Sequence, residues 1–218
     1  MFGELISFID VLKSTAIDLR GRKLGAEREA TISALLETYF NLKDAADEGE
    51  LLLEDAQPNP VAVIGSLNPV EAKERLASWD YALRRQTVRL MRVSDTIFGQ
   101  EFMSVIAPEL EEKLHDVLGT KFNRATSLHG IGAALFFRGW TDGTNEEKAR
   151  YVSIMAGEEN DLLHMDKIRA EIVALREAME GYRIVVNDLA TADEIIRLSR
   201  SARKATQLDD AFRSQSTQ

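Results

Sequence analysis

The sequence contains no cysteine, which excludes disulfides, zinc–thiolate sites, iron–sulfur clusters and thiol nucleophiles. It has only four prolines and thirteen glycines in 218 residues, so long helices can run without interruption. No apolar run reaches the roughly 18 residues that a transmembrane helix requires, and the N-terminus lacks the basic segment of a signal peptide. We therefore expect a cytoplasmic protein.

The sequence has fewer basic residues than acidic ones, 27 against 36. The net charge is −9, which disfavours a general nucleic-acid coat, because binding phosphates requires a cationic surface. The composition, 44% hydrophobic and 29% charged, is that of a folded soluble protein. We predict one helical domain over residues 1–207, followed by a disordered tail over residues 208–218.

What the sequence does have is apolar residues spaced three and four apart in four separate stretches. The clearest stripe is Met165, Ile168, Ile172, Leu175, Met179, Tyr182, Val186 and Leu189. This spacing keeps one side of a helix facing a partner helix over many turns. The pattern predicts an all-α fold, an antiparallel bundle of five to seven helices that includes long, heptad-patterned, coiled-coil-like helices.

Local signals place the ends of several of these helices. Asn68, Pro69 and Glu71 form a helix start, and Thr191 with Glu194 forms a capping box. The second signal leaves two alternatives open, a break after the 165–189 helix or one continuous rod. We predict further helices over residues 2–20, 26–56, 108–118 and 121–138 and from about residue 145, with the apolar run 61–64 as a loop packed on the bundle.

Two residues on the predicted stripes are unusual. Gly49 stands on the stripe of the 26–56 helix, where glycine costs about 1 kcal/mol relative to alanine, so we expect another backbone to approach it closely. Gln86 stands on the stripe that also holds Leu83 and Leu90. A polar residue inside a stripe can fix register, but buried polar groups need partners, so we expect Gln86 to lie at the edge and reach water.

Two pairs of a carboxylate and a histidine have the spacing of metal ligands on a helix. Glu112 precedes His115 by three residues, and Asp161 precedes His164 by three, the spacing found in the di-iron sites of ferritin-like bundles. The stripe of the 108–118 helix points Glu112 and His115 away from the core, and His164 lies beside its stripe. Since such ligands should project into the bundle interior, we predict neither a metal site nor another cofactor.

The segment Arg124-Ala-Thr-Ser-Leu-His129 resembles the Arg-x4-6-His motif of HEPN-domain ribonucleases. That resemblance covers six residues and implies a dimeric helical bundle that cleaves RNA without a metal. His129 would then transfer protons and Arg124 would hold the phosphate. Ala125 stands where the family often has a polar residue.

No nucleophile elbow and no phosphate-binding loop accompany this motif. Because no coherent catalytic constellation emerges, the leading hypothesis is a non-enzymatic interaction or regulatory protein. Its helical surface would face a protein partner or a second copy of the chain in a homodimer. The ribonuclease that uses Arg124 and His129 is the alternative.

Overall fold

The computed structural model describes residues 25–57, 60–98 and 165–208, and all regular structure in these ranges is helical. The helices are α2 (Gly25–Asp55), α3 (Pro60–Ser66), α4 (Pro69–Phe98), α8 (Met165–Leu189) and α9 (Ala192–Ala205). The all-α prediction is confirmed for this part of the chain. The complete bundle of five to seven helices stays a prediction, because the helices expected within residues 1–24 and 99–164 lie outside the described residues.

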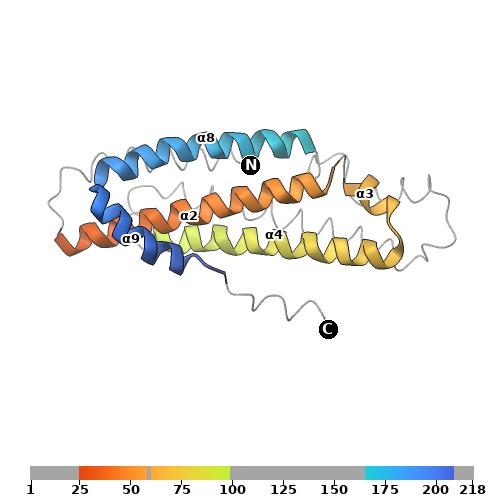
Figure 1. The fold of residues 1–218 in the computed structure, drawn as a ribbon, viewed down its shortest axis with the longest axis horizontal. Coiled ribbons are helices and arrows are strands. Elements are labelled where there is room, and N and C mark those ends of the chain that lie inside the picture. Colours follow the sequence, from red (N-terminus) through yellow and green to blue (C-terminus); the bar gives the residue numbers. More distant parts are fainter. Residues whose placement is uncertain (1–24, 58–59, 99–164, 209–218) are drawn as a thin grey trace.

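Helix α2 lies in the middle of the described part, with α4 along one side and α8 along the other (Figure 1). Both neighbours run opposite to α2: Trp79 near the start of α4 meets Asp55 at the end of α2, and Ile172 of α8 lies beside Gly49. Helix α9 packs on α2 as well, and α3 contacts α4. Helix α2 is therefore the element on which the other long helices assemble.

The helix ends agree with their local signals. The Asn68 side-chain oxygen accepts hydrogen bonds from the backbone N–H groups of Val70 and Glu71, both at 3.0 Å, which starts α4. Thr191 and Glu194 form the expected capping box at the start of α9. Of the two alternatives at this point, the break is therefore correct and the continuous rod is wrong, since α8 ends at Leu189.

The prediction of a loop over residues 61–64 is wrong, because these residues belong to α3. Pro60 is the first residue of this helix, a position where a missing backbone N–H costs nothing. Ile64 is buried against the core, while Ala62 and Gly65 are exposed. Ile64 therefore reaches the core from a short helix of seven residues.

The stripes read from the sequence form the core of the described helices. The buried stripe residues are Ile32, Leu35, Leu42, Ala46 and Leu53 of α2, Trp79, Leu83, Leu90 and Val93 of α4, and Met165, Ile172, Leu175, Met179, Tyr182 and Val186 of α8. Helix α2 also buries Leu36, Thr38 and Asn41 beyond its stripe, which fits an element that has neighbours on more than one side.

Gln86 does not lie at the edge, as the sequence suggested: only 1% of it is exposed. Its side-chain amide donates a hydrogen bond of 3.1 Å to the backbone oxygen of Ala45 in α2. Gly49 makes room for that amide, since a Cβ at position 49 would lie 2.9 Å from Gln86 Nε2 and 3.4 Å from Ile172 Cδ1. Among the described residues, the groups nearest to Gly49 are thus side chains of α4 and α8, not another backbone.

Candidate functional site

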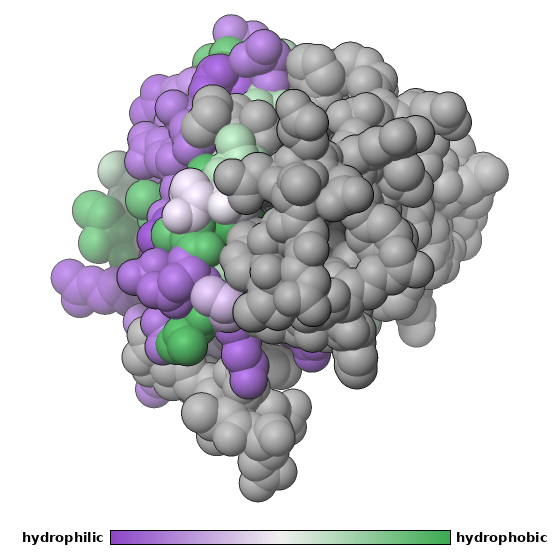
Figure 2. Space-filling view, turned by 90° about the vertical axis from the view of Figure 1, so that its right-hand side faces the viewer, coloured by the Kyte–Doolittle hydropathy of each residue, from purple (hydrophilic) through white to green (hydrophobic). Residues whose placement is uncertain are grey.

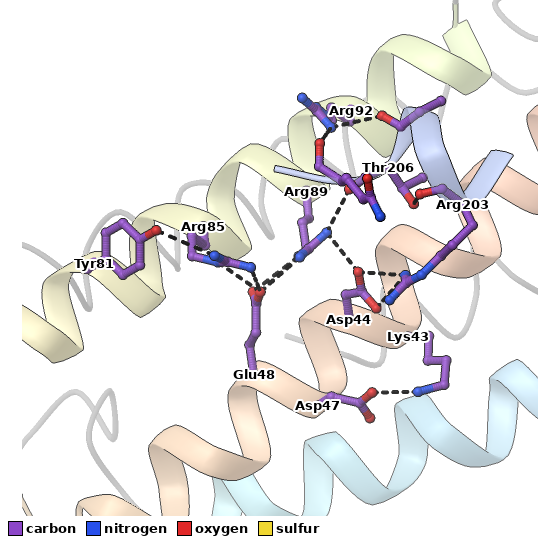
Figure 3. Close-up of polar contacts among 12 residues, drawn as sticks. Lys43, Asp44, Asp47, Glu48, Tyr81, Arg85, Arg89, Arg92, Arg203 and Thr206 are labelled. Carbon is purple, nitrogen blue, oxygen red and sulfur yellow. Dashed lines mark hydrogen bonds and ion pairs between the residues drawn. The ribbon is translucent and has the colours of Figure 1, made fainter. Parts of the chain in front are cut away.

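The most concentrated polar chemistry in the described residues surrounds a buried arginine of α4. Arg89 is 3% exposed, and its side chain extends from α4 toward α2 (Figure 3). Its Nη2 donates to Glu48 Oε1 at 2.9 Å, and its Nη1 lies 3.0 Å from Asp44 Oδ2. Burial of a guanidinium requires such partners, because an unpaired charge in a protein interior is strongly destabilising.

Glu48 is shared between two arginines of α4. Arg85 Nη2 lies 2.8 Å from Glu48 Oε1, and Arg85 Nη1 reaches the hydroxyl of Tyr81 at 3.4 Å (Figure 3). Burial lowers the pKa of Arg85, but the contacts with Tyr81 and Glu48 outweigh it and raise the pKa above its ordinary value. The two arginines and the two carboxylates hold α4 and α2 in register.

Helix α9 joins the same network from the other side. Arg203 donates to both oxygens of Asp44, at 2.7 and 2.8 Å, and its guanidinium carbon lies 5.4 Å from the centre of the Phe40 ring. Arg89 Nη1 also donates to the backbone oxygen of Thr206, at 3.2 Å, just after the end of α9. Asp44 and Arg89 therefore connect α2, α4 and α9.

A second set of charges joins α8 to α2. Arg176 Nη2 lies 2.9 Å from Asp47 Oδ1 and also contacts Glu50. Burial raises the pKa of Asp47, but Lys43 and Arg176 outweigh it and hold that pKa below its ordinary value. These groups are more exposed than Arg89, so their contribution to stability is modest.

Tyr182 connects α8 to α2 in the interior of the protein, where it is fully buried. Its hydroxyl donates to the backbone oxygen of Leu35 at 2.9 Å, and its ring stacks on Tyr39 with centres 6.4 Å apart. Complete burial raises the pKa of Tyr182 well above the usual range for tyrosine. Its phenol therefore stays neutral in the folded protein.

These clusters hold helices together through charged hydrogen bonds. Arginine stays protonated in proteins and cannot act as a general base, and no histidine occurs in the three described ranges. Within those ranges, no group of three or more histidine, aspartate or glutamate side chains is arranged to hold a metal ion. The described helices also include none with the length and apolar character needed to cross a bilayer.

The site residues expected from the sequence all lie outside the described residues. Arg124 and His129 of the ribonuclease hypothesis fall in residues 99–164, as do the metal candidates Glu112, His115, Asp161 and His164. The structure therefore places none of them. Both hypotheses about these residues stay predictions.

The network around Arg89 was missed in the sequence, although a signal for it exists. Asp44 and Glu48 are four residues apart, as are Arg85 and Arg89, so each pair shares one helix face. An acidic pair on one predicted helix and a basic pair on the next are complementary. Apolar periodicity alone does not reveal this, because it ignores charge.

Two of the large apolar residues that are exposed in the described helices lie on the outward side of α8. Val173 is 50% exposed and Ile184 is 58% exposed. They stand eleven residues apart, close to three helical turns, so they share one side of the helix. Figure 2 views the molecule from one end. Its coloured part, which the structure describes, is mostly hydrophilic with apolar groups between the polar ones.

Comparison of the chain with protein-family models, with curated proteins and with solved structures returned no match.

Proposed function

We propose that this chain is a non-enzymatic interaction or regulatory protein that offers helical surface to a protein partner or to a second copy of itself. The observation that supports the proposal most directly is the outward side of α8. Val173 and Ile184 are both at least half exposed there, on one side of a helix whose opposite side packs on α2. Apolar residues that share one side of a helix are the groups through which a helix docks in a partner's groove.

The charge of this surface indicates which partner it favours. Glu177 and Glu180 lie between Val173 and Ile184 on the outward side of α8, and both are exposed. Glu180 is paired with Arg183 of the same helix, whereas two copies of this surface facing each other would bring their Glu177 side chains together, at a cost in electrostatic energy. A partner that presents apolar residues flanked by basic ones fits better than a second copy.

The test is a comparison of two double variants of the full chain. Val173→Ser with Ile184→Ser removes the proposed anchors. Val70→Ser with Ile196→Ser is the matched control, because it changes the same residue types at exposed positions on α4 and α9. Each protein is immobilised to recover bound proteins from its native extract, and light scattering measures its mass in solution.

We expect the first variant to lose the partner, or the dimer, by about tenfold or more in affinity, since each buried apolar side chain contributes about 1–2 kcal/mol. The control should bind as the unchanged chain does. Equal binding by both double variants, or an unchanged chain that is monomeric and retains nothing, would contradict the proposal.

The ribonuclease alternative stays a proposal that depends on Arg124 and His129. Its test is RNA cleavage by the unchanged chain and by His129→Ala with EDTA present. A loss of cleavage in the variant would support the alternative. Equal background cleavage in both proteins would remove it.

A further inference from the structure

Helix α9 has its own hydrogen-bonded caps at both ends. The Thr191 capping box satisfies backbone groups at its start, and the Thr206 backbone N–H bonds back to the carbonyl of Ala202 at its end. Only Ala190 and Thr191 separate it from α8. Its hydrogen bonding therefore does not depend on continuity with α8.

The apolar contact that holds α9 is small. Leu198 and Ala202 are its buried apolar residues, and Ile195 is partly buried against the core. The long helices α4 and α8 each bury a full-length stripe by comparison. Because hydrophobic stabilisation scales with apolar area, α9 is held less firmly by burial than its neighbours are.

Charged contacts also join α9 to α2. Near its start, Arg197 Nη2 donates to Glu29 Oε1 at 2.5 Å, and both side chains are exposed. Near its end, Arg203 pairs with Asp44. The exposed Arg197–Glu29 pair weakens most as salt rises, the Arg203–Asp44 pair less because Asp44 is mostly buried, and apolar contacts do not weaken.

Two arginines of α4 also bind the end of α9. Arg92 Nη1 donates to the backbone oxygens of Ala205 and Gln207, at 3.1 and 3.3 Å, and Arg89 donates to that of Thr206 (Figure 3). The last carbonyls of a helix carry partial negative charge, which a guanidinium complements. The C-terminal end of α9 is thus held by cations from another helix.

We propose that α9 is a strap held by a small apolar contact and by salt-sensitive charged contacts, which detaches as a unit about Ala190 and Thr191 while α2, α4 and α8 stay folded. Detachment removes the α9 partners of Phe40, Asp44 and Arg89. It therefore uncovers the Phe40 ring of α2 and the Asp44–Arg89 pair between α2 and α4. Raised ionic strength favours the open form. This inference rests on the α9 contacts alone and is independent of the proposed partner surface on α8.

A single introduced thiol measures this opening directly, because the chain has no cysteine. Ala202→Cys places the thiol on α9 at a position that is 0% exposed, and Ala46→Cys places one at a similarly buried position on α2. The rate at which a thiol reagent labels each variant reports how often its position opens. The first thiol reports release of α9, and the second reports opening of the central helix.

We expect labelling of Ala202→Cys to be about tenfold faster than labelling of Ala46→Cys, as local opening requires. Raising NaCl from about 0.01 M to about 1 M shortens the screening length from about 30 Å to about 3 Å. Labelling of Ala202→Cys should then rise about fivefold, from the screening of the exposed Arg197–Glu29 pair and of the partly exposed Arg203–Asp44 pair. Labelling of Ala46→Cys should not rise.

Adding Arg92→Ala to Ala202→Cys tests the clamp at the end of α9. It should raise labelling about threefold, because both carbonyl contacts are lost. Arg84→Ala is the control, since Arg84 is an exposed arginine of α4 paired with Asp80 of the same helix. Equal labelling at positions 202 and 46, or no response to salt and to Arg92→Ala, would overturn the proposal.

Hydrogen exchange of the unchanged chain provides a second readout that needs no thiol. The amides of α9 should exchange before those of α2 and α8, and faster at high salt. Exchange of α9 together with α8 at every salt concentration would likewise overturn the proposal. Because this measurement uses the unchanged chain, its result does not depend on any change of packing that Ala202→Cys causes.

Discussion

Gly49 and Gln86 illustrate how single residues decide the packing of this protein. The amide of Gln86 occupies the space that a Cβ at position 49 would take, and it donates to the carbonyl of Ala45. A glycine that is unfavourable for the helix thereby permits a buried hydrogen bond between two helices. Substitutions at Gly49 and Gln86 should therefore have non-additive effects on the free energy of unfolding.

A double-mutant cycle tests this coupling. In the unchanged chain, Gly49→Ala should lower the free energy of unfolding by about 1 kcal/mol, because Gln86 must move from Ala45. With Gln86→Ala present, the same substitution should raise it by up to about 1 kcal/mol, the usual gain for alanine in a helix. Urea denaturation of the four proteins gives both values, and an effect of Gly49→Ala with the same sign in both backgrounds would contradict the account.

Because of Tyr182, the free energy of unfolding should depend on pH in the alkaline range. Its pKa is raised by burial in the folded state, whereas in the unfolded chain a tyrosine ionises near pH 10. The folded state therefore holds a proton that the unfolded state releases, and this stabilisation is present below about pH 10 and lost as pH rises above it.

The pH dependence gives a prediction for Tyr182→Phe. Above about pH 10, the free energy of unfolding of the unchanged chain should fall more steeply than that of the variant, by up to about 1.4 kcal/mol per pH unit. Below pH 9 the variant should be less stable, because it lacks the hydrogen bond to Leu35. Parallel pH profiles for the two proteins would show that Tyr182 is not buried as described.

Single residues also mark the limit of sequence analysis. The stripe through Tyr182 predicted burial correctly, since periodicity reports which side of a helix faces inward. It could not show that Gln86 has a partner in Ala45, because that depends on the register between two helices. For the same reason the burial of Arg89 was missed. The candidates Arg124 and His129 lie outside the described residues and stay predictions.

At the scale of elements, helix ends were predictable and helix contacts were not. The starts of α4 and α9 follow from caps within four residues, at Asn68 and Thr191. Helix α3 was missed because its seven residues are too few to show a period. The charged contact between α2 and α4 depends on which helices become neighbours, which no local pattern contains.

Removal of Arg89 tests how strongly that contact holds α2 to α4. Arg89→Met should lower the free energy of unfolding by about 3 kcal/mol or more, because Asp44 and Glu48 lose a buried counter-charge. Arg84→Met, on the same helix with an exposed pair, should change it by less than about 0.5 kcal/mol. Denaturant titration compares them, and similar values for the two variants would refute the structural role of Arg89.

At the scale of the whole molecule, α2 is the organising element. It meets α4 through Gln86 and Arg89, and it meets α8 through Tyr182 and Ile172. Helix α9 pairs with it at Glu29 and Asp44. With its sides occupied, α2 leaves the outward side of α8 as the surface proposed for a partner. The strap formed by α9 adds a second surface that is presented only on opening.

The contact between α2 and α8 is the part of this arrangement on which the rest depends, and the nuclear Overhauser effect measures it directly. Tyr182 is 147 positions away from Leu35 in the sequence, so no local structure can bring them together. The account predicts strong cross-peaks from the Tyr182 ring to Leu35 and to Tyr39. A Tyr182 ring that shows cross-peaks only to residues within four positions of its own helix would contradict it.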